Sequence, residues 1–236
     1  ALGDASLVDW AVNHPYGFRQ FIGHALRDDG IQWERSMPYH RYTMSGLLRL
    51  TEAAYRCGLD LYGMKTEGMA DLVVENHYST DVTRLPKGLK MAFEVFPLLR
   101  FPDGSYPQYG DGDTFWNGAA EQDLVGLRRY RTPALAWHAE RSGLLQPTST
   151  PDWRTMVTLA SMGDVSQYQT LARQWNWADG TFANSGQVRN GSSLFPSSGI
   201  TMLRETTGAD DRLGTAAAVM YGPFGGGHGH AAQLGM

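Results

Sequence analysis

The chain has 236 residues, of which 42% are hydrophobic and 19% charged, and its formal net charge at pH 7 is -4. This composition is typical of a globular protein with a well-buried core, and the slightly negative charge gives no sign of a nucleic-acid partner. No apolar run reaches the roughly 18 residues that a membrane-spanning helix needs, so we expect no membrane partner.

Helical periodicity dominates the first three quarters of the chain. Residues Ala1–Arg27 predict a helix interrupted at Pro15-Tyr16-Gly17, and Pro38 begins a helix that closes at Cys57-Gly58. Cys57 excludes an internal disulfide, and its apolar neighbours predict a small buried side chain. Further helices are predicted over about Lys65–His77, Leu85–Leu99, Glu121–Ser142 with a kink at Pro133, Pro151–Met162 and Val165–Trp175.

The stretch Asp29–Tyr42 is dense in groups that can transfer protons. Asp29-Gly30 predicts a turn, and Tyr39, His40 and Tyr42 would lie at the start of the following helix. Free backbone donors and the helix dipole favour an anion there, so a substrate carboxylate is one expected occupant. The alternative is that both tyrosines pack the helix start while His40 and the arginines are solvated. The residues alone leave both interpretations open.

Between Phe101 and Gly118 the helical period disappears, and repeated turn dipeptides predict a long structured loop. Its aspartates do not match the spacing of the twelve-residue calcium site. Three of its aromatic rings either stack on sugars along a cleft or merely anchor the loop: Tyr106, Tyr109 and Trp116.

After Trp177-Ala178-Asp179-Gly180 the pattern changes to short strands, predicted within Ser193–Arg204 and Thr215–Tyr221. A helical domain over residues 1–185 thus gives way to a β region over 186–236. Two or three strands are too few for an independent sandwich, so we expect the chain to be a piece of a longer protein.

The segment Gly222–His230 places His228 and His230 two residues apart behind a run of glycines. On a strand, residues i and i+2 project from one face, so both rings would point the same way. Imidazole suits proton transfer near neutral pH and also zinc binding. A flexible tail is the alternative.

Three segments together resemble the heparinase II/III-type polysaccharide lyases and the related oligo-alginate lyases. They are DG-x3-E-x4-YH at Asp29–His40, FP-x-SGI-x2-LR at Phe195–Arg204 and GPFGGGHGH at Gly222–His230, in the family's order over nearly all of the chain. The resemblance implies a multi-domain α-then-β fold, in which an incomplete (α/α) toroid precedes the start of an antiparallel β-sandwich. It also implies β-elimination on uronic-acid polysaccharides.

By this resemblance, Tyr39 matches the tyrosine that donates a proton to the leaving oxygen, and His228 matches a histidine that faces the cleft from the β region. His230 matches a ligand of a structural zinc, and no organic cofactor is expected. A phenol with a reference pKa of about 10 needs cations nearby, and Arg35, His40 and Arg41 are expected to supply them. The residues expected to bind substrate are Glu34, Arg35, His40, Tyr106 and Trp116.

Two positions depart from the family pattern. Asn13-His14 lies too close to Asp29 to match the family's carboxylate-neutralising Asn or His, and Ala231-Ala232 stands where the family usually has Ala-Asp. The expected partner is an anionic uronate polysaccharide or oligosaccharide, and the expected location is periplasmic or secreted.

Two other classes of protein remain open. One is a carbohydrate-binding protein with a degenerate site. The other is a glycoside hydrolase on an (α/α) toroid, in which Glu34 faces Asp111 or Asp113 across the cleft.

Overall fold

A computed structural model of the chain describes residues 4–66, 86–109, 120–146, 153–175, 187–189, 191–205, 214–221 and 234–235. Within these ranges the helices come first and the strands follow, as the sequence predicts. The helices are α1 Ala5–Asn13, α2 Phe18–Ala25, α3 Met37–Arg56, α5 Leu89–Leu98, α6 Ala120–Tyr130, α7 Pro133–Arg141, α8 Trp153–Met162 and α9 Ser166–Ala172. The strands are β1 Gln187–Arg189, β2 Ser192–Phe195, β3 Ile200–Arg204, β4 Ala216–Tyr221 and β5 Leu234–Gly235.

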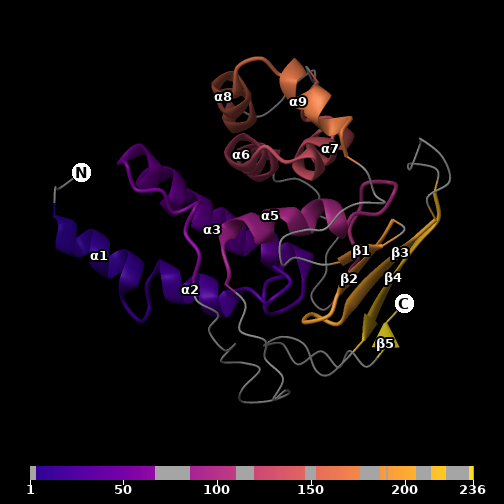
Figure 1. Cartoon of the computed structure of the whole chain (residues 1–236), viewed down its shortest axis with the longest axis horizontal. Coiled ribbons are helices and arrows are strands. Elements are labelled where there is room, and N and C mark those ends of the chain that lie inside the picture. The colour runs from indigo at the N-terminus through magenta and orange to yellow at the C-terminus, as the bar shows by residue number, and fades with distance from the viewer. Residues whose placement is uncertain are drawn as a thin grey trace.

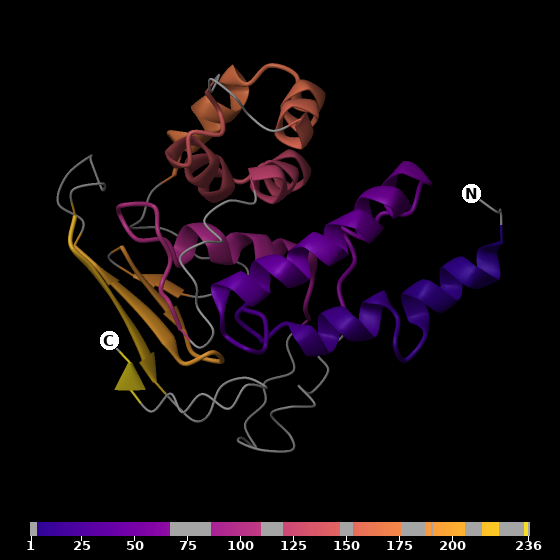
Figure 2. The ribbon, with the colours of Figure 1, turned by 180° about the vertical axis from the view of Figure 1, so that it is seen from behind.

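Helix α5 lies at the centre of the molecule, with the sheet to one side of it (Figure 1). Helices α1, α2 and α3 extend away from the sheet, and α6 to α9 form a separate group that contacts α5 through α6 and α7 (Figure 2). None of the helices in the described ranges is long and apolar enough to cross a membrane.

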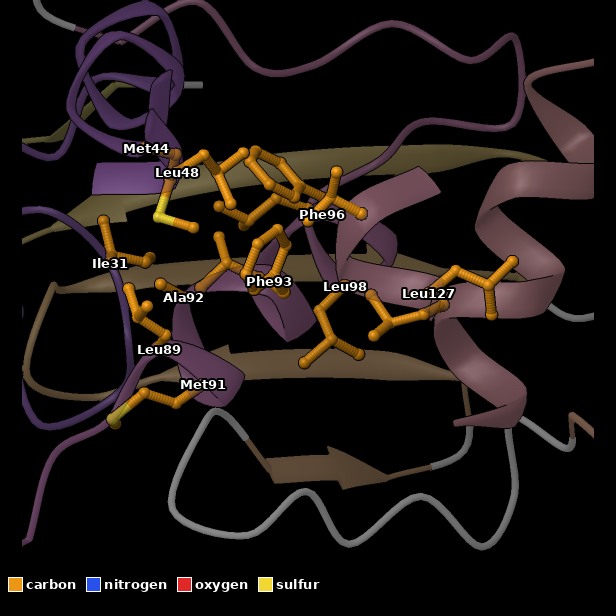
Figure 3. Close-up of a cluster of buried hydrophobic side chains, with 14 of the residues drawn as sticks. Ile31, Met44, Leu48, Leu89, Met91, Ala92, Phe93, Phe96, Leu98 and Leu127 are labelled. Carbon is orange, nitrogen blue, oxygen red and sulfur yellow. The ribbon is translucent and has the colours of Figure 1, made fainter. Parts of the chain in front are cut away.

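Nearly every residue of α5 is buried, because apolar side chains cover its whole circumference. Figure 3 shows Met44 and Leu48 of α3 and Leu127 of α6 meeting the side chains of α5. Helix α6 comes close because Gly126 has no side chain: a Cβ there would lie 2.4 Å from the ring of Phe93. The core therefore joins both groups of helices through α5.

Helix α3 follows the sequence signals at both ends. Ser36 is its N-cap, Pro38 lies in the first turn, and Gly58 after the last turn has a φ of 85°. The prediction that Cys57 is buried is wrong, because its side chain is exposed. Buried side chains of α3 end at Thr51, so the last turn projects beyond the core.

The predicted helix over Glu121–Ser142 is two helices, and the prediction of a single kinked one is wrong. Arg131 between them has a φ of 49°, and Thr132 caps α7 by accepting a hydrogen bond from the Leu135 amide at 3.4 Å. Pro133 lacks the N–H that a continuous helix requires, so the chain starts a new helix there.

The strands form one antiparallel sheet in the order β1-β2-β3-β4-β5. The segment Ser193–Arg204 forms two strands, which the turn Pro196–Gly199 joins. Phe195, Ile200 and Met202 of this hairpin are fully buried in the common core. The predicted boundary near residue 185 falls outside the described residues, as does most of the helix predicted over Lys65–His77.

Candidate functional site

The Asp29-Gly30 turn forms as the sequence predicts, and it rests on α5. The Gly30 amide donates to the Arg27 carbonyl at 2.9 Å, and the Arg27 amide donates to the Ile31 carbonyl at 2.8 Å. Gly30 has a φ of 88°, and a Cβ there would lie 2.6 Å from the carbonyl oxygen of Met91. Only glycine fits both conditions, because its φ is positive and a side chain would overlap the backbone of α5.

The carboxylate of Asp29 binds the turn that joins β2 to β3. It accepts hydrogen bonds from the amide and the hydroxyl of Ser198, each at 2.7 Å, and from the Ile31 amide at 3.4 Å. Burial raises the pKa of Asp29, and the hydrogen bonds from Ser198 oppose that effect. Asp29 and Ser198 are 169 positions apart, so this contact joins the first lyase-like segment to the second.

Two guanidinium groups reinforce the same junction. Arg27 donates to the Ser197 carbonyl at 2.8 Å, and Arg35 donates to the Ser198 carbonyl at 3.1 Å. Arg35 is buried and has a φ of 63°, an unusual backbone conformation for a side chain of its size. Burial lowers the pKa of Arg35 to about 10, so it remains a cation at neutral pH.

Strand β4, which precedes the third lyase-like segment in the sequence, ends at the same place. The Tyr221 amide, at the end of β4, donates to the Gly199 carbonyl at 2.7 Å. Gly199 has a φ of 63°, and a Cβ there would lie 2.1 Å from the Tyr221 carbonyl oxygen. The chain leaves this contact directly into Gly222–His230. His228 and His230 themselves lie outside the described residues, as does Trp116.

Tyr39 lies in the first turn of α3 and is half-buried. The next residue, His40, is fully buried: its Nδ1 accepts from the Gln32 amide at 3.1 Å, and its Nε2 donates to the Ala92 carbonyl at 2.9 Å. Burial lowers the pKa of His40 to about 4, so the expectation that it supplies a positive charge is wrong. Its ring instead ties the segment before α3 to α5.

Arg41 faces a buried polar cluster. Its guanidinium donates to Asp123 at 3.1 Å and to the Tyr106 hydroxyl at 3.0 Å, and it lies 4.1 Å from the centre of the Phe96 ring. The Nε2 atom of His138 lies 3.2 Å from Asp123 and 3.3 Å from the Tyr106 hydroxyl. Burial alone would raise the pKa of Asp123, but the charge of Arg41 overrides it and holds that pKa at about 2.

Tyr106 was expected to stack on substrate. The structure instead holds its hydroxyl in this cluster, and burial raises the pKa of its phenol to about 12. Asp123 and His138 were not predicted as functional residues, because each lies in a predicted helix without a motif around it. The signal in the sequence that could have indicated them is an acid and a histidine on helix faces that are otherwise apolar.

Glu34 is half-buried beside Gln32, whose side-chain amide donates to it at 3.4 Å. Among the described residues, no group of three or more His, Cys, Asp or Glu side chains is placed to hold a metal ion. Glu34 and Arg35 lie on the segment just before α3, and Tyr39 and His40 lie in its first turn.

Comparison of the chain with protein-family models, with curated proteins and with solved structures finds no match in any of the three.

Proposed function

We propose that the protein is a polysaccharide lyase that cleaves a uronic-acid chain by β-elimination. One observation carries the proposal: the first two segments that resemble the lyase family meet at one junction, beside the end of the strand that precedes the third in the sequence. Asp29 binds Ser198, and Gly199 of the same turn binds Tyr221, where the glycine-histidine segment begins. The order of helices and antiparallel sheet is compatible with an incomplete toroid followed by the start of a sandwich.

The proposed reaction needs a base, an acid and a group that stabilises negative charge. A base takes the proton from C5, the C4–O4 bond breaks, and the electron pair of the C5–H bond becomes part of the new C4–C5 double bond. Tyr39 donates its phenolic proton to the departing O4. His228 is proposed to face the same bond from the β region.

The start of α3 offers groups that stabilise the substrate carboxylate. The N-cap residue Ser36 makes no side-chain hydrogen bond to the first backbone N–H groups of α3, and its buried hydroxyl has no partner among the described residues. The helix dipole favours an anion at this end. The cations Arg27 and Arg35 lie on the adjoining segment, so the local charge also favours a uronate.

Zinc is proposed as a structural ion with His230 among its ligands, and no step of the reaction passes through it. It would contribute to the folding of the β region. A periplasmic or secreted location is proposed with the substrate class.

The substitution Tyr39→Phe tests the proposed acid directly. On a panel of alginate, hyaluronan, chondroitin and heparan sulfate, product formation is followed by the ultraviolet absorbance of the new double bond. We expect this variant to keep the fold and substrate binding and to lose about 10² to 10⁴ in turnover, the usual contribution of a general acid or base. Tyr55→Phe, on the exposed last turn of the same helix, is the matched control and should keep parental activity.

Unchanged turnover in the Tyr39 variant with an unchanged pH profile would refute the assignment of the acid. Tight binding of a uronate polymer by the parental protein without any product would instead favour a carbohydrate-binding protein.

A further inference from the structure

A groove of about 540 Å³ lies between α3 and the successive helices α1 and α2, at the end of the molecule away from the sheet. Figure 2 shows the helices that form its walls. Its volume falls within the roughly 300 to 1,000 Å³ of small-molecule sites. The residues that line it include Tyr16, Phe21, Tyr42, Thr43, Gly46 and Arg49.

The groove lies along α3, the helix whose first turn carries Tyr39, although Tyr39 itself does not line it. Tyr42, Thr43 and Gly46 follow Tyr39 at spacings of three, four and seven residues, and Arg49 comes one further turn along. Residues at these spacings share one face of a helix. A polysaccharide with one sugar bound at Tyr39 can therefore extend along this face of the helix into the groove.

The exposed aromatic rings of the groove suit the apolar faces of sugar rings. Tyr16 is 90% exposed, Tyr42 is 67% exposed and Phe21 is 45% exposed. A ligand that covers such exposed rings removes apolar surface from water, which favours binding. Tyrosine also has a polar hydroxyl that can form hydrogen bonds. The hydroxyl of Thr43 adds a further polar group to the wall.

The charge of the groove favours an acid. Among the described residues that line the groove, Arg49 is the single charged one and none is a carboxylate, although the chain as a whole carries a net charge of -4. Arg49 is exposed and makes no ion pair within the described residues. A guanidinium can bind a carboxylate with two parallel hydrogen bonds, which a neutral sugar cannot accept in the same way.

We infer that this groove is an extended subsite. It binds further uronate residues of the polysaccharide whose scissile bond lies at Tyr39. The inference rests on the proposed function for its substrate class. Tyr16 and Tyr42 stack on the sugar rings, and Arg49 binds a carboxylate at the far end.

The experiment fills the groove without removing any contact. A Cβ built on Gly46 meets nothing within 4 Å, so Gly46→Gln should fold, and its melting temperature should rise because glycine weakens a helix interior. Calorimetry then measures the dissociation constants of tetrasaccharides from alginate, hyaluronan and heparosan, with cellotetraose as the uncharged probe. We expect Gly46→Gln and Tyr42→Ala each to weaken binding of the best uronate at least about tenfold.

Arg49→Ala tests the charge. It should weaken binding of the uronate tetrasaccharide and leave binding of cellotetraose unchanged, whereas Arg56→Ala should change neither. Arg56 is the matched control because it is exposed on the same helix, two turns further on, and does not line the groove.

The outcomes separate this inference from the proposed function. Loss of binding in the groove variants without any unsaturated product in the parental protein would support the groove and reject the lyase. Product formation with unchanged dissociation constants in Gly46→Gln would support the lyase and overturn the groove. A parental dimer that Gly46→Gln dissociates, seen by sedimentation, would assign the groove to a second copy of the chain and also overturn the inference.

Discussion

Removing the carboxylate of Asp29 should destabilise the whole fold, because this side chain joins the helices to the sheet. Asp29→Ala takes the acceptor away from two donors of Ser198, the amide and the hydroxyl, each bound at 2.7 Å. Both residues are buried, at 2% and 1% exposure, so water cannot replace the lost acceptor without rearrangement. A buried donor without a partner costs about 1 to 3 kcal/mol.

Two such donors predict a loss of roughly 2 to 6 kcal/mol in the free energy of unfolding, which is a large part of the usual total of about 5 to 15 kcal/mol. The melting temperature of a chain of this size should fall by about 2 to 4 °C for each kcal/mol. Urea unfolding followed by circular dichroism measures both the midpoint and the slope, and an unchanged slope shows that the variant unfolds from a native-like state.

The chain contains a matched control. Asp103 accepts the same pair of bonds from Ser105, to the amide at 2.9 Å and the hydroxyl at 2.6 Å, but in an exposed turn and across only two positions. Water can satisfy Ser105 when the carboxylate is removed, so Asp103→Ala should cost about 0.5 kcal/mol or less. If the two variants unfold within that margin of each other, Asp29 does not hold the sheet to the helices and the reasoning is refuted.

Three further predictions concern pH, backbone space and metal. The folded state binds the His40 proton only below about pH 4, whereas the unfolded chain binds it below about pH 6.5, so parental stability should fall as the pH drops through this window. His40→Gln should flatten that part of the curve of unfolding free energy against pH, and an unaltered slope would contradict the buried neutral ring. Gly199→Ala should lose at least about 2 kcal/mol, since its Cβ would overlap a backbone carbonyl, whereas Gly46→Ala should gain about 0.5 to 1 kcal/mol; equal melting temperatures would contradict both geometries. His230→Ala should release zinc and lower the melting temperature, while His228→Ala should keep the metal and lose turnover, and metal analysis with the opposite pattern would exchange the two roles.

Local signals were enough to predict most helices and strands. Helix α3 begins beside Pro38 and ends before Gly58, and the apolar run of Leu85–Leu99 contains α5, which the core fully surrounds. The turn at Asp29-Gly30 was also predicted, because its chemistry depends on neighbouring residues alone. The change from helices to an antiparallel sheet was visible in the same way.

The predictions that failed depend on what packs against a segment. Cys57 continues the helical spacing, but the buried positions of α3 end at Thr51, and the thiol beyond the last turn is exposed. His40 looked like a cation beside Tyr39, yet the Gln32 amide and the Ala92 carbonyl hold it neutral in the core. Burial decides the charge of an imidazole, and periodicity along one segment does not report burial.

The sequence by itself determined where the chain turns, which stretches are helical or extended and which three segments resemble a lyase. Only the tertiary structure decided that Asp29 meets Ser198 across 169 positions and that Arg41 meets Asp123 across 82. Such contacts form because burying a carboxylate or a guanidinium is costly unless a partner is bound. The partner can come from any part of the chain that the fold brings near, so no local pattern names it.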